Sequence, residues 1–113
     1  PSWACVHCGD VHLRAVRVGA ERTAAEFGRS FPGVPVLWSQ GASPIRTVED
    51  EPAIIVATAG VEPWVKSGYA ALLILDARGQ LQRASLRAGE EAARRWFQAA
   101  CLRRSPLMRP AKR

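Results

Sequence analysis

Two cysteines near the start of the chain have the spacing of a metal-binding knuckle. The stretch ACVHCGD places Cys5 and Cys8 two residues apart and follows them with Gly9. Structural zinc is held by four tetrahedral ligands, commonly two such Cys-x-x-Cys pairs, because this spacing lets both thiolates reach one ion. One pair is half of that arrangement. We therefore expect Cys5 and Cys8 to bind zinc together with further ligands.

Other candidate ligands are less well placed. Cys101 lies in a predicted helix, where a lone cysteine usually packs as a small apolar side chain. His7 lies inside the knuckle and tends to point away from its ion, and His12 stays an alternative ligand. Redox chemistry of the thioredoxin kind is the competing interpretation, but it requires the first cysteine at a helix N-terminus. Gly9 and Asp10 disfavour a helix at this point.

The net charge of +6 on these 113 residues is concentrated in the C-terminal third. Residues 1–76 have a balance of −2, whereas residues 77–113 have a balance of +8. A basic segment can bind phosphates with an affinity that falls as salt rises. A solvated helix face with a basic tail is an equally good interpretation. The candidate phosphate contacts are Arg83, Arg87, Arg103, Arg104 and Arg109.

The four tryptophans divide into two pairs. Trp3 and Trp64 are candidates for stacking bases, as aromatic side chains do in single-strand grooves. Trp38 ends a predicted strand, and Trp96 belongs to an apolar helix stripe, so we expect both to be packed.

The apolar pattern predicts alternating strands and helices within one domain. Strands are predicted at residues 12–19, 34–39, 53–59 and 70–77. Amphipathic helices are predicted at 20–31, where Pro32 and Gly33 stop the helix, and at 86–102. The unbroken apolar runs of the last two strands are typical of a parallel sheet. We therefore predict an α/β fold with a mostly parallel sheet and a surface loop at 39–52.

The second helix carries two further predictions. Its apolar stripe is expected to consist of Ala92, Ala93, Trp96, Phe97 and Ala100. Glu90 with Arg94 and Glu91 with Arg95 are spaced for ion pairs along the helix. Asp76 ends the fourth predicted strand and is expected to cap a turn.

Four short motifs follow one another in a specific order: Cys-x-x-Cys-Gly at 5–9, Gly-x-Glu-Arg at 19–22, Phe-Pro-Gly at 31–33 and Leu-Arg-x-x-Glu at 86–90. With PAIIVATAG between the last two, nearly the whole chain resembles the replication-restart primosomal helicases (primosomal protein N prime, PriA). The resemblance implies that residues 1–11 end a zinc-binding insertion and that 12–105 are part of the second, RecA-like helicase lobe. Residues 106–113 form a basic tail. It also implies that Cys5 and Cys8 share a zinc ion with cysteines upstream of this chain.

The motifs of the motor depart from the family pattern. Where motif V is expected, the chain reads ATAGVEPWVKSGY, in which Thr58 and Lys66 correspond. Residues 98–105 align with motif VI, and Leu102 and Ser105 replace the two arginines that face the nucleotide phosphates. Loss of such an arginine costs about 10³ to 10⁵ in the rate of phosphoryl transfer.

These features predict a replication-restart protein that binds forked or single-stranded DNA and recruits primosome and replication proteins without helicase activity. An active ATP-dependent 3'–5' DNA helicase, with ATP bound in the parent protein, is one alternative, and a zinc-containing structural or interaction module is another. We expect a cytoplasmic, nucleoid-associated protein without a membrane span, because the longest apolar run is too short for one. Missing neighbours of the sheet predict an open edge and self-association.

Overall fold

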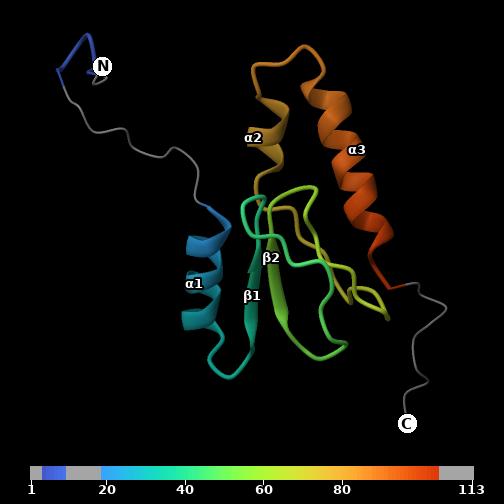
Figure 1. Ribbon diagram of the computed structural model, residues 1–113. Helices are drawn as coiled ribbons and strands as arrows, with labels where there is room; N and C mark the ends of the chain where they lie inside the picture. The colour runs from blue at the N-terminus through green and yellow to red at the C-terminus, as the bar shows by residue number, and fades with distance from the viewer. Residues whose placement is uncertain (1–3, 10–18, 105–113) are drawn as a thin grey trace.

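The computed structural model describes residues 4–9 and 19–104 and is shown in Figure 1. Its elements follow the order α1 (Ala20–Ser30), β1 (Val36–Ser39), β2 (Ile54–Ala57), α2 (Ala77–Leu81) and α3 (Ala88–Cys101). The predicted strand at 12–19 and the tail at 106–113 lie outside the described residues, apart from Gly19.

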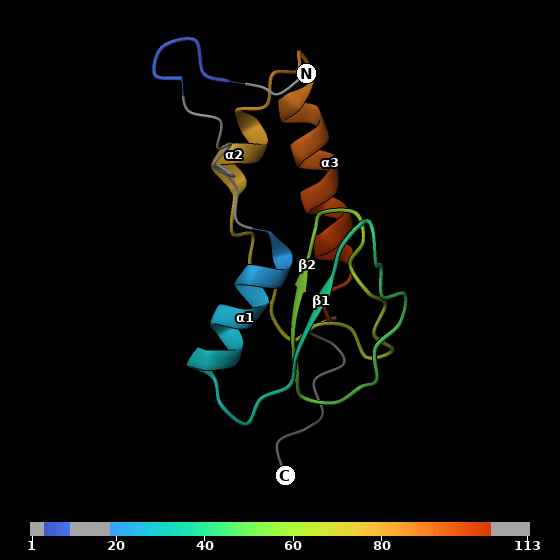
Figure 2. The ribbon, with the colours of Figure 1, turned by 60° about the vertical axis from the view of Figure 1, so that its left-hand side comes forward.

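The two strands form a parallel sheet, which confirms the α/β prediction. Val36 pairs with Ile54, and Ser39 pairs with Ala57 at the other end. Residues 40–53 join the strands without a helix, as expected for the predicted surface loop. In both views α1 lies on one side of the strands, and the loops that follow them lie on the other (Figure 1, Figure 2).

Helix α1 has the predicted bounds to within one residue, because its sequence contains both the stripe and the stop signal. Ala24 is buried, and α1 contacts both strands. The rings of Phe27 and Phe31 lie 6.1 Å apart, so the stripe continues to the end of the helix. The chain then turns at Gly33, whose φ of +88° suits a residue without Cβ.

The predicted strand at 70–77 is wrong. Residues 71–74 have no regular structure, and Ala77 already begins α2. A strand needs a neighbour to satisfy its backbone groups, and the described sheet consists of β1 and β2, with which residues 70–77 do not pair. Asp76 then accepts a hydrogen bond from the Gly79 N–H at 3.1 Å and caps α2, as expected for a turn. Leu73 and Leu75 are consequently 81% and 64% exposed.

Helix α3 packs against α2, but its buried face differs from the predicted stripe. Buried alanines at 88, 92 and 99 form that face. Phe97 is 74% exposed and Ala100 is exposed, so the prediction is wrong for both. The predicted pairs between Glu90 and Arg94 and between Glu91 and Arg95 do not form. Among the described residues, the observed ion pair joins Arg22 and Glu26 in α1, at 3.7 Å.

The core is small and built mainly from small side chains. Its buried members are Ala24, Val56, Ala88, Ala92, Ala99, Pro63 and Ser39. Most large apolar side chains outside this set are partly exposed, including Trp38 at 43%, which we had expected to be packed. Among the described residues, no helix has the length and apolar content needed to cross a membrane.

Candidate functional site

The cysteine knuckle is a turn that favours a thiolate on Cys5. The backbone N–H of His7 is the main cause of a lowered pKa at the Cys5 thiol, and the backbone and thiol of Cys8 act in the same direction. The Gly9 N–H donates to the Cys5 carbonyl oxygen at 2.9 Å, and Gly9 has a φ of +70°. Hydrogen bonds to a sulfur stabilise its charged form, and at Cys5 they outweigh the opposite effect of burial on the pKa. The turn therefore suits a metal-binding thiolate.

A structural zinc site needs four ligands, and this knuckle contains two cysteines. Cys5 is half-buried and Cys8 is exposed. Within residues 4–9 and 19–104, no group of three or more histidine, cysteine or acidic side chains is placed to hold a metal ion. Cys101 does not join the knuckle there, and it is exposed, which contradicts the prediction of a buried side chain. His12 lies outside the described residues.

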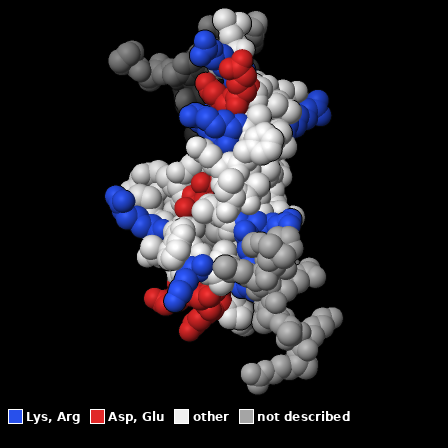
Figure 3. All heavy atoms as spheres, turned by 90° about the vertical axis from the view of Figure 1, so that its right-hand side faces the viewer, with Lys and Arg blue, Asp and Glu red and all other residues white. Residues whose placement is uncertain are grey.

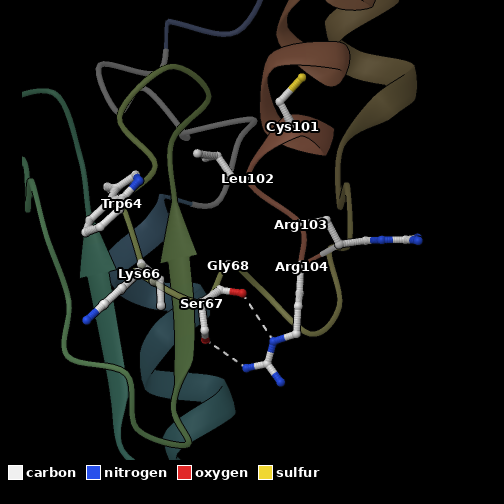
Figure 4. Close-up of a pocket in the computed structure, with 9 residues that line it drawn as sticks. Trp64, Lys66, Ser67, Gly68, Cys101, Leu102, Arg103 and Arg104 are labelled. Carbon is white, nitrogen blue, oxygen red and sulfur yellow. Dashed lines mark hydrogen bonds between the residues drawn. The ribbon is translucent and has the colours of Figure 1, made fainter. Parts of the chain in front are cut away.

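The second candidate site joins the segments aligned with motifs V and VI. Residues 64–68 lie against residues 101–104 at the end of α3, and together they line a pocket of about 210 Å³ (Figure 4). The Tyr69 N–H donates to the Leu102 carbonyl at 2.9 Å, and the Arg104 N–H donates to the Tyr69 carbonyl at 2.7 Å. These two backbone bonds hold the loop against the end of the helix. Sequence reasoning had identified Lys66, Arg103 and Arg104 separately and had not placed them together.

Arg104 lines this pocket. Its Nε donates to the Ser67 carbonyl at 3.2 Å, and one terminal nitrogen donates to Ser67 Oγ at 2.8 Å (Figure 4). The Ser67 hydroxyl in turn donates to Asp50. The Ser67 hydroxyl group therefore links the Arg104 guanidinium to the Asp50 carboxylate. This arrangement ties Arg104 to the loop through two of the five N–H donors of its guanidinium, and its role as a phosphate contact stays a prediction.

Gly68 allows the loop and helix to approach so closely. A Cβ at this position would lie 2.8 Å from the Arg104 backbone nitrogen, and the φ of Gly68 is +73°. Both observations require glycine. The sequence signal that could have identified this contact is the Ser-Gly pair, which marks a turn but names no partner.

A second loop holds the other side of the same segment. The Trp64 N–H donates to the Arg46 carbonyl at 2.8 Å, and the Val48 N–H donates to the Trp64 carbonyl at 3.1 Å. Tyr69 adds a hydrogen bond from its hydroxyl to the Pro63 carbonyl at 2.7 Å. Burial raises the pKa of the Tyr69 hydroxyl, and the negative charge of Glu62 adds to this effect. The backbone around the pocket is therefore fixed from both sides.

The predicted phosphate-binding arginines do not form one patch. Arg83 and Arg87 are exposed between α2 and α3, whereas Arg103 is exposed beyond the other end of α3. These two places are separated by about 20 Å, the length of a 14-residue helix. On the face shown in Figure 3, acidic side chains lie between the basic ones. Arg109 lies outside the described residues.

The tryptophans differ in exposure and in hydrogen bonding. Trp64 is 55% exposed at the pocket, so it keeps the surface that stacking requires. Trp96 is half-buried, and its Nε1 donates to Gln80 at 3.0 Å, in agreement with the prediction that it is packed. Trp3 lies outside the described residues.

Comparison with known proteins identifies relatives of one kind. The chain is 48% identical over 102 residues, 90% of its length, to the "Probable replication restart protein PriA" of Mycobacterium tuberculosis strain H37Rv. It is 50% identical over 101 residues to the protein of the same name from Mycobacterium leprae. The chain spans 16% of the length of each of these curated relatives. No protein-family model and no solved structure matches the chain. The resemblance to the replication-restart family is therefore confirmed as a match of nearly this whole chain to one segment of PriA.

Proposed function

We propose that this chain is part of a replication-restart protein that binds forked or single-stranded DNA and recruits primosome components without unwinding DNA. The names of its relatives support the restart role. The proposed absence of helicase activity rests on the sequence and contacts of the segment that aligns with motif VI. It has Leu102 and Ser105 at the positions of the nucleotide-facing arginines, and its Arg104 is tied to Ser67.

The fold assignment is also part of this proposal. Residues 12–105 form part of a RecA-like second lobe, in which the parallel strands β1 and β2 and helix α1 are retained. The helicase motifs of this lobe would face the nucleotide in an active family member. In this chain the two motif segments are joined by backbone hydrogen bonds of Tyr69 to Leu102 and Arg104, which supports a structural role for their contact.

In this proposal residues 1–11 are the end of a zinc-binding insertion. Cys5 and Cys8 would hold one zinc ion with two cysteines from a preceding segment, and the lowered pKa of Cys5 favours the thiolate that the ion requires. Bound zinc would supply a rigid cross-link between the two knuckles. Elemental analysis of the longest natural polypeptide that carries this sequence should find zinc, which C5S and C8S reduce and C101S does not. A metal-free wild-type protein contradicts this part of the proposal.

DNA binding is assigned to the exposed arginines, among them Arg83, Arg87 and Arg103. The double variant R83A/R87A should weaken fork binding and reduce its dependence on salt, because each phosphate contact releases counterions. R29A removes an exposed cation from α1 and serves as the matched control. A place at the nucleoid and contacts with replication proteins follow from this role.

The deciding experiment is ATP hydrolysis by the longest natural polypeptide that carries this sequence, with and without forked DNA. We expect fork binding without turnover. Hydrolysis stimulated by the fork would mean that arginines from elsewhere replace those lost at positions 102 and 105, and the protein would then be an active helicase. Absence of fork binding would contradict the proposed function itself.

A further inference from the structure

We propose that the pocket between residues 64–68 and 101–104 is a subsite for single-stranded DNA. In this subsite Trp64 stacks one base, Lys66 on the same side of the pocket contacts a phosphate, and Arg103 on the other side contacts a phosphate further along the strand. The proposal rests on the DNA binding proposed above. It adds the location of the binding site, the single-stranded form of the DNA and a role for each residue. The members of the subsite come from two segments that the fold brings together.

Trp64 is exposed on a backbone that is held in place. The residue is 55% exposed, while both of its backbone polar groups are bonded to residues 46 and 48. The following turn is closed by the Gly68 N–H, which donates to the Val65 carbonyl at 3.0 Å. A fixed backbone reduces the conformational entropy that is lost when a base stacks on the side chain. An exposed indole on a fixed backbone therefore suits a stacking platform.

The surroundings of Trp64 are positively charged. The nine residues that line the pocket include Lys66, Arg103 and Arg104 and no acidic side chain. Lys66 and Arg103 are exposed, have no ion pair among the described residues, and project from opposite sides of the pocket (Figure 4). A strand that crosses the pocket would meet Lys66 on the same side as Trp64 and Arg103 on the other side (Figure 4).

Arg104 has a different role in this arrangement. Its Nε and one terminal nitrogen are bonded to Ser67, and Ser67 is bonded to Asp50, so the side chain is held by the loop. It is a positioning residue that keeps the loop, and with it Trp64, against the end of α3. Phosphate contact is thus assigned to Lys66 and Arg103.

The size of the pocket favours a stacked base over an enclosed nucleotide. Its volume of about 210 Å³ lies below the roughly 300–1,000 Å³ of pockets that enclose small-molecule ligands. Stacking on one exposed ring needs no enclosure, and it tolerates every base because each has a π-face. The expected ligand is therefore a single strand without strong sequence preference.

The first test measures binding of a dye-labelled oligothymidylate and of forked DNA to the longest natural polypeptide that carries this sequence. We expect W64A to lower the affinity for the single strand by about 5- to 150-fold, the range for loss of one stacked base. W38A is the matched control, since Trp38 is 43% exposed and does not line the pocket. K66A should reduce the slope of log affinity against log salt by about 0.7, whereas R29A should not.

The second test locates the strand without any substitution. Cys101 is exposed and lines the pocket, so a bound strand should slow its alkylation, which mass spectrometry of the Cys101 peptide can follow. Protection by the oligothymidylate supports the subsite. Protection by ATP alone would overturn it in favour of a nucleotide site.

The outcomes separate this subsite from the proposed function. If the wild-type protein binds forked DNA and W64A and W38A bind the single strand equally well, the subsite is wrong and the proposed function stands. If the wild-type protein binds no DNA, both are wrong.

Discussion

A single buried hydroxyl group connects three parts of the fold, and its removal should be costly. Ser39, at the end of β1, is 0% exposed. Its Oγ donates to the Val61 carbonyl at 2.7 Å and accepts from the Ile45 N–H at 3.0 Å. The S39A variant leaves a carbonyl and an N–H without a partner. Each costs about 1–3 kcal/mol when buried, and the half-exposed Val61 and Ile45 place the total near the lower end.

We therefore expect S39A to lower the free energy of unfolding by about 2–3 kcal/mol, a large part of the roughly 5–15 kcal/mol of a typical domain. Urea unfolding followed by circular dichroism measures this change. S43A is the matched control, because Ser43 is exposed in the next loop and should change stability by less than about 0.5 kcal/mol. Equal stability of the two variants would refute the view that Ser39 links β1 to the loops at 45 and 61.

Three further predictions concern the pocket loop and the exposed surface. G68A should destabilise the chain by about 2 kcal/mol or more in the same assay, because its Cβ meets the Arg104 backbone at a positive φ. G28A, in an open helical position, should be neutral or stabilising, and the reverse order would contradict the argument. The absorbance of Tyr69, the one tyrosine of the chain, should titrate above its ordinary pKa of 10.0. The raised pKa contributes stability below that value, which is lost as the pH rises through the folded pKa; a midpoint at or below 10.0 would exclude the burial described here. Light scattering should show self-association at high concentration that L75E weakens, and a monomeric mass throughout would refute it.

The sequence was sufficient to predict the elements that are determined locally. The spacing of Ala24 and Phe27, followed by Pro32, is enough to specify α1 and its end. The short apolar runs at 36–39 and 54–57 specify β1 and β2 in the same way. The segment 70–77 has the same kind of pattern, yet a strand also needs a neighbour, which a local pattern cannot supply. Phe97 was misplaced for a similar reason, since a helix stripe is buried only where another element covers it.

The pocket could not be predicted because its parts meet only through tertiary contacts. Ser67 and Arg104 are 37 residues apart, and neither is part of a spacing pattern that names the other. Lys66 and Arg103 were identified as candidates from their type and from the family alignment. Their common location depends on the close approach at Gly68, which a sequence shows only as a turn. The knuckle is the opposite case, since all of its geometry lies within five consecutive residues.

The exposed run at 70–75 has a consequence for the handling of this protein and for its folding in the cell. It reads AALLIL, a six-residue apolar window without charge or proline, which is the composition of an aggregation-prone segment. Asp76 and Arg78 follow immediately and act as charged gatekeepers at its end. Asp76 also caps α2, so one carboxylate both begins the helix and limits the association of strands. Neutralising it should therefore reduce solubility and helix content together.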